Sequence, residues 1–122
     1  ELGDLIWPVF VRSGEGIEEP IPSMPGVFRR SVDKVVVAAR EAADLGIGAM
    51  CIFPYTGIED RTEDCAGAWD PENNPNRAIR AIREAVPEMV IMTDVALDTY
   101  NINGHDGFVE DGIIVNDRTV EA

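Results

Sequence analysis

The chain has 122 residues, of which 10 are basic and 23 acidic, giving a formal net charge of −13. Negative charge repels phosphate backbones and anionic lipids, so the composition disfavours nucleic acids and membranes as partners. No stretch approaches the roughly 20 apolar residues of a membrane span, and the first residues lack the basic and apolar regions of a signal peptide. The two cysteines form no CxxC pair, which indicates no disulfide framework. We therefore expect a cytoplasmic protein.

The first predicted elements are a strand, a long loop and a helix. Residues 5–11 are a continuous apolar run without polar alternation, which predicts a strand buried on both faces. Residues 12–30 are rich in glycine and proline and predict a loop with fixed turns. Ser31 is a suitable helix N-cap, and apolar residues then recur at helical spacing until Gly46 provides a stop.

The same alternation continues in the next segments. Residues 49–53 predict a second buried strand, and an acidic polar loop follows over residues 55–73. Asn74 and Pro75 are typical of a helix start, and this second helix is expected to end at Pro87. A third buried strand is predicted to open at Met89 and to continue through Leu97.

The last part of the chain predicts a hairpin and the start of a helix. Apolar pairs flank Glu110, Asp111 and Gly112, a pattern that favours a tight β-turn, and Asn116 or Asp117 could begin a helix. Strands that alternate with helices predict an α/β fold with a parallel sheet and right-handed crossovers.

The chemistry is expected where the parallel strands end, because α/β folds place their sites at that edge. The segment after the third strand is the richest in polar groups. Strand alternation would put Asp94 and Asp98 on one face, and a turn at Gly104 could return Asp106 to the same place. Clustered carboxylates can bind a hard cation or raise one another's pKa for proton transfer.

Plainer explanations exist for the same residues. Asp98 and Asp106 are equally consistent with ordinary loop carboxylates, because aspartate favours turns. Asp94, inside an apolar strand, would need partners if buried. The single histidine, His105, fits a structural role better than a ligand role.

Several motifs in register resemble one family. Residues 94–107 follow the pattern DVxLxxYxxxGHxG, residues 5–11 resemble that family's first strand, and residues 20–27 read PIPSMPGV. Residues 116–120, NDRTV, fall in the expected order as well. The chain thus resembles the N-terminal half of the porphobilinogen synthase (5-aminolevulinate dehydratase) family, and the resemblance covers nearly all of it.

The resemblance implies a fold and an activity. It implies a TIM (β/α)8 barrel, of which residues 1–122 would be the N-terminal half of one domain, truncated at both ends. Only the first three or so βα units and a β-hairpin would be present. The family forms cytoplasmic homo-octamers. Its members are lyases of heme and other tetrapyrrole biosynthesis, and they condense two molecules of 5-aminolevulinate to porphobilinogen with loss of two waters.

The resemblance also implies that this chain alone is inactive. Family members hold their substrates as Schiff bases on two lysines, and the chain has only Lys34, outside that context. The lysines and the contacts to the substrate carboxylates are expected in the missing C-terminal half.

The metal position of the family differs here from its zinc-dependent branch. Zinc-type members have three cysteines where this chain has Ala96, Asp98 and Asp106. Thiolates select zinc and carboxylates select harder ions, so we expect no catalytic zinc. Similarity to aspartate-type bacterial members implies that Asp98 and Asp106 lie beside the substrate amine and help to transfer protons, with Asp94 in support. Asp98 and Asp106 would bind Mg²⁺ or K⁺ weakly, or no metal.

Two other functions fit the sequence less well. One is a different TIM-barrel enzyme, such as an aldolase-type carbon–carbon lyase, and the other is a non-catalytic acidic domain that binds cations. The second finds little support, because no run of acidic residues has EF-hand spacing.

Overall fold

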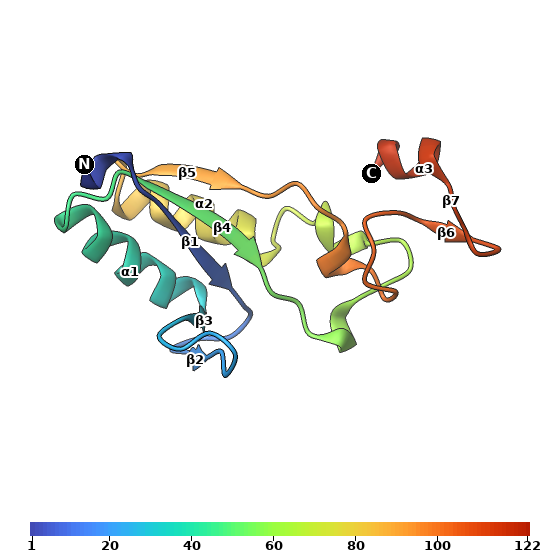
Figure 1. Ribbon diagram of the computed structural model, residues 1–122, viewed down its shortest axis with the longest axis horizontal. Coiled ribbons are helices and arrows are strands. Elements are labelled where there is room, and N and C mark those ends of the chain that lie inside the picture. The colour runs from blue at the N-terminus through green and yellow to red at the C-terminus, as the bar shows by residue number, and fades with distance from the viewer. The chain divides into compact units, whose positions relative to one another are not determined.

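A computed structural model describes residues 1–122 (Figure 1). The chain divides into two compact units, and each is described by itself. The first unit contains Glu1–Tyr55 and Asn74–Asp94, and the second contains Thr56–Asn73 and Val95–Ala122.

The first unit is built on a five-stranded sheet with the order β2-β3-β1-β4-β5. Its strands are β1 (Ile6–Val11), β2 (Glu18–Pro20), β3 (Phe28–Arg30), β4 (Ala49–Pro54) and β5 (Val90–Thr93). Figure 1 shows β1, β4 and β5 pointing the same way, and the pairings β1–β3, β1–β4 and β4–β5 are all parallel. Helices α1 (Val32–Asp44) and α2 (Asn74–Ala85) connect them. The predicted α/β order and the largely parallel sheet are therefore confirmed.

One face of the sheet packs against the two helices. Alternate residues of the central strands, Val9 and Val11 on β1 and Met50 and Ile52 on β4, are at most 2% exposed. They form a single core with side chains of both helices, namely Val35, Ala39, Ala42, Ala78 and Ile82, and with the adjoining Val86 and Met89. This alternation follows from the period of two in a strand, which points every second side chain at the helices.

The other face of the sheet is apolar and much less covered. The register aligns Phe10 with Phe53, and their ring centroids lie 6.0 Å apart. On the same face Ile6 is 50%, Val90 59% and Met92 44% exposed. The expectation that the strands are buried on both faces is therefore wrong for this chain, because no helix or strand of the first unit packs on this second face.

Two short strands lie inside the segment that the sequence predicts to be a loop. β2 and β3 pair antiparallel, with Glu19 opposite Arg29, and β3 joins the sheet beside β1. Each has three residues and carries charge, so neither shows an apolar run. Ser31 does precede α1 as predicted, but its hydroxyl bonds to Ile17 instead of capping the helix.

The second unit has a small core made of Cys65, Tyr100 and Phe108, with Ala68 and Leu97 packed against it. The hairpin and terminal helix are confirmed as β6 (Val109–Glu110), β7 (Ile113–Ile114) and α3 (Asn116–Glu121). Asp111 and Gly112 both have positive φ, 50° and 79°, as the favoured two-residue hairpin turn requires. Short 3-10 helices cover Leu2–Asp4 in the first unit and Ile58–Asp60, Ala66–Ala68 and Asp98–Tyr100 in the second.

None of the helices has the length and apolar character needed to cross a membrane.

The packing of the core predicts that two valines of α1 contribute differently to the free energy of unfolding. Val35 is fully buried and Val37 is 54% exposed. Val35→Ala should lower the free energy of unfolding by about 2 kcal/mol, because it removes buried methyl groups and leaves a cavity. Val37→Ala is the matched control and should change it by less than about 0.5 kcal/mol. Urea denaturation measures both, and equal losses would contradict this description of the core.

Candidate functional site

The third strand is shorter than the sequence predicts. β5 ends at Thr93, and Leu97 already precedes a 3-10 helix over Asp98–Tyr100. Strand alternation therefore cannot align Asp94 with Asp98, and that part of the prediction is wrong. Asp94 directly follows β5 in the first unit and is exposed, so it is not the buried strand carboxylate that would need partners.

Asp98 and Asp106 are brought together in the second unit. Gly104, with φ of 71°, turns the chain, and its N–H donates to the carbonyl oxygen of Asn101. Asp106 then returns to the start of the turn. Its Oδ1 accepts hydrogen bonds from the backbone N–H of Leu97 at 2.7 Å and of Asp98 at 3.0 Å. We call residues 97–106 the acidic turn.

A buried polar residue, Asn101, anchors the acidic turn to the small core of the second unit. Asn101 is 1% exposed, its Nδ2 donates to Cys65 Sγ at 3.3 Å, and its Oδ1 accepts from the N–H of Asn103 at 2.7 Å. Thr62 bonds the backbone on both sides of Asn101. Burial raises the pKa of Tyr100 to about 12. The sequence places Cys65 in a polar loop and gives no sign that it is fully buried.

The geometry limits what the acidic turn can bind. The side chains of Asp98, His105 and Asp106 are exposed, and one oxygen of Asp106 is already occupied by two amides. Nowhere in the chain do three His, Cys, Asp or Glu side chains form a group that could hold a metal ion. The acidic turn therefore does not by itself provide a complete set of metal ligands.

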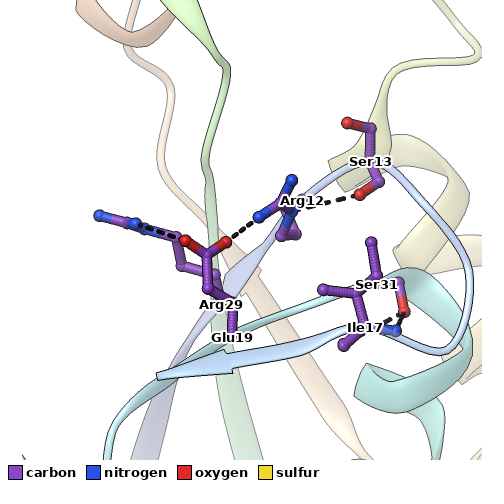
Figure 2. A network of polar contacts seen from close by, with 6 residues as sticks. All are labelled: Arg12, Ser13, Ile17, Glu19, Arg29 and Ser31. Carbon is purple, nitrogen blue, oxygen red and sulfur yellow. Dashed lines mark hydrogen bonds and ion pairs between the residues drawn. The ribbon is translucent and has the colours of Figure 1, made fainter. Parts of the chain in front are cut away.

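A second polar cluster lies where β1 and β4 end. The sequence places residues 12–16 and 53–55 at these strand ends but does not indicate that Glu19 and Arg29 join them. Figure 2 shows the Glu19 carboxylate between the guanidinium groups of Arg12 and Arg29, and the contact to Arg29 is 3.4 Å long. Both guanidinium groups also lie over the ring of Tyr55, at 4.1 Å for Arg29 and 5.8 Å for Arg12. Arg12 and Tyr55 lie side by side because β1 pairs with β4, and Glu19 and Arg29 join them because β2 and β3 fold back on the sheet.

The loop after β1 is tied to the start of α1. Gly16 donates its backbone N–H to the carboxylate of Asp33, and Ile17 donates its own to Ser31 Oγ at 2.9 Å. Hydrogen bonding by the Ser31 hydroxyl and by the Gly16 amide lowers the pKa of Asp33. These bonds fix the position of the loop at the carboxyl edge of the sheet.

Comparison with known proteins decides which family this arrangement belongs to. The family model described as delta-aminolevulinic acid dehydratase matches residues 1–122. The chain belongs to the delta-aminolevulinic acid dehydratase family. Delta-aminolevulinic acid dehydratase of Rhodobacter capsulatus is 50% identical over 119 residues, which are 98% of this chain and 36% of that protein. The enzyme of that name from Bradyrhizobium diazoefficiens is 46% identical over 117 residues, 96% of this chain and 33% of that protein.

A solved dehydratase structure matches the fold closely. The delta-aminolevulinic acid dehydratase (porphobilinogen synthase) of Toxoplasma gondii ME49, in complex with the reaction product porphobilinogen, superposes with a TM-score of 0.93 at 40% sequence identity. The match covers 99% of this chain and 35% of that one. The chain thus spans about a third of the length of these dehydratases. The family resemblance is confirmed, and neither an aldolase-type lyase nor a cation-binding domain is favoured by any of these matches.

The arginine cluster leads to a stability prediction. Glu19→Gln keeps the shape of the side chain but leaves Arg12 and Arg29 without a shared counter-charge. Because these groups are only 25–37% exposed, the change should cost about 1–2 kcal/mol of unfolding free energy, between the values for surface and buried ion pairs.

Glu18→Gln is the control for this change. Glu18 pairs only with Arg30 and is 45% exposed, so its loss should cost less than about 1 kcal/mol. Urea denaturation and limited proteolysis of residues 12–30 measure both variants. Equal stability of the two would show that the cluster does not hold β2 and β3 in place.

Proposed function

We propose that this chain is the N-terminal part of a porphobilinogen synthase, a lyase that condenses two molecules of 5-aminolevulinate to porphobilinogen with loss of two waters. The observation that carries the proposal is the match of 99% of the chain, with a TM-score of 0.93, to a dehydratase that holds porphobilinogen. Identity of 50% to the Rhodobacter capsulatus dehydratase supports it independently.

The proposal includes a complete TIM barrel in the longer protein. The face of the sheet that carries Phe10, Phe53 and the exposed Val90 is apolar. In a TIM barrel the inner face of the strands is filled by layers of such side chains. We infer that further strands outside residues 1–122 complete the barrel, so that this face lines its interior. We also infer that the family's cytoplasmic homo-octamer forms from the completed barrels.

The proposed roles of the aspartates follow from the chemistry of the reaction. Loss of two waters needs groups that give and take protons beside the reacting atoms. Asp98 and Asp106 occupy the family's metal-site positions with carboxylates in place of cysteines, so we place the proton-transfer site at the substrate amine at this pair, with Asp94 in support. At most a weakly bound Mg²⁺ or K⁺ would sit at Asp98 and Asp106, and no catalytic zinc.

The substrates themselves must be held elsewhere. Lys34, in the first turn of α1, is the only lysine of the chain and is partly exposed. The two Schiff-base lysines of the family therefore belong to the part of the protein outside residues 1–122, and residues 1–122 alone should make no porphobilinogen.

The activity can be tested with the full-length parent protein and 5-aminolevulinate. We expect the parent protein to form porphobilinogen, measured by its coloured product with Ehrlich's reagent, and residues 1–122 to form none. Borohydride added with the substrate should reduce the Schiff bases and label lysines outside this chain, as read by peptide mass spectrometry. Absence of product from the parent protein, or labelling of Lys34, would contradict the proposal.

The absence of catalytic zinc gives a separate test. Treatment of the parent protein with 1,10-phenanthroline, which chelates zinc, should leave more than about half of the activity, because carboxylates at positions 98 and 106 do not select zinc. The isomer 1,7-phenanthroline does not chelate and controls for inhibition by the ring system. A large loss with the first compound alone, reversed by added zinc, would refute the aspartate-type assignment.

A further inference from the structure

The two aspartates of the acidic turn are held in different ways. Asp106 is engaged through its side chain, because its Oδ1 accepts the N–H groups of Leu97 and Asp98. Asp98 is engaged through its backbone, because its N–H donates to Asp106 and its carbonyl accepts the N–H of Asn101 at 3.3 Å. Hydrogen bonds therefore hold the carboxylate of Asp106 in place, whereas those of Asp98 hold its backbone.

The bonds made by Asp106 supply partners that the local backbone lacks. Leu97 and Asp98 stand at the start of a 3-10 helix, where N–H groups have no acceptor within the helix itself. Hydrogen bonds from an amide to an ionised carboxylate are roughly twice as strong as neutral ones. Asp106 thus closes the turn back on its first two residues.

The far end of the same turn has independent anchors. Tyr100 and Asn101 are buried, and the backbone around them bonds to Thr62. The start of the turn is held by Asp106, by the packing of Leu97 against the small core and by the bonds of one short 3-10 helix. Asp98 itself has an exposed side chain, and its N–H donates to Asp106, so its backbone position and the direction of its side chain depend in part on Asp106.

We propose that Asp106 is a positioning residue: it fixes the backbone of Asp98, and Asp98 alone exchanges protons with the substrate. This inference rests on the proposed function and divides the roles that the family resemblance assigns to the pair jointly. An acceptor oxygen at position 106 is then essential, whereas its negative charge is secondary.

Three variants of the full-length parent enzyme separate these roles. Asp106→Ala removes the acceptor and should lower kcat about 100-fold, the effect of a displacement of about 1 Å at a reacting group. Asp106→Asn keeps an amide oxygen that can accept both N–H groups, so its kcat should be at least about tenfold higher than that of Asp106→Ala. Asp98→Asn keeps the turn but removes the proton-transfer group, and should lower kcat about 100-fold or more. KM should change less than about threefold in all three variants. Asp111→Asn, in the exposed hairpin turn, is the matched control and should behave as the wild type.

Hydrogen exchange gives a readout that does not need activity. The amides of Leu97 and Asp98 should exchange faster in Asp106→Ala than in the wild type, by mass spectrometry of the peptide that contains them, and should stay protected in Asp106→Asn. If the parent protein makes no porphobilinogen, the proposed function is refuted while the exchange result still reports on positioning. If Asp106→Asn is as inactive as Asp106→Ala while both amides stay protected, the charge itself is required and the inference is overturned.

Discussion

The arrangement of the first unit depends on the parallel pairing of β1 with β4 over six residue pairs, from Ile6–Ala49 to Val11–Pro54. This register carries the ends of both strands to the same edge of the sheet. It also points Val9 and Met50 at the helices, where burial of each such side chain contributes roughly 1.5–3 kcal/mol. The polar cluster of Arg12, Glu19, Arg29 and Tyr55 stands on that edge because the apolar residues below it fix the strands.

The second unit is held together in a different way. Its core has only three buried apolar residues, and side-chain hydrogen bonds hold the acidic turn in place beside it. The buried side chain of Asn101 forms hydrogen bonds with Cys65 and Asn103. The exposed side chain of Asp106 accepts hydrogen bonds from the backbone N–H groups of Leu97 and Asp98. This arrangement fixes the backbone of the acidic turn while leaving the side chain of Asp98 exposed to solvent.

Much of the fold could be predicted because its signals are local. The apolar runs at β1 and β4, the helical spacing of α1, and the Asp111-Gly112 turn each depend on a few neighbouring residues. The same reasoning fails where distant residues decide. β2 and β3 exist only because they pair with each other and with β1, and β5 stops at Thr93 although apolar residues continue to Leu97. The run 5–11 predicts burial on both faces, but Ile6 on the second face is 50% exposed.

The acidic turn was predictable in part for the same reason. The pattern of residues 94–107 points to Asp98 and Asp106, and Gly104 indicates the turn that joins them. No sequence rule could show that Asp106 accepts two amides, because that depends on the 3-10 helix that Leu97 precedes. The placement of Arg12 and Arg29 around Glu19 was equally hidden, since it follows from strand pairing.

The uncovered face of the sheet also determines how copies of this chain behave toward one another in solution. The net charge of −13 makes copies repel, and this repulsion reaches about 30 Å in 0.01 M salt but only about 8 Å at 0.15 M. Attraction between faces that bear Ile6, Val90 and Met92 acts at contact and is not screened by salt. Colloidal stability of residues 1–122 therefore falls as ionic strength rises, which is the opposite of salting-in.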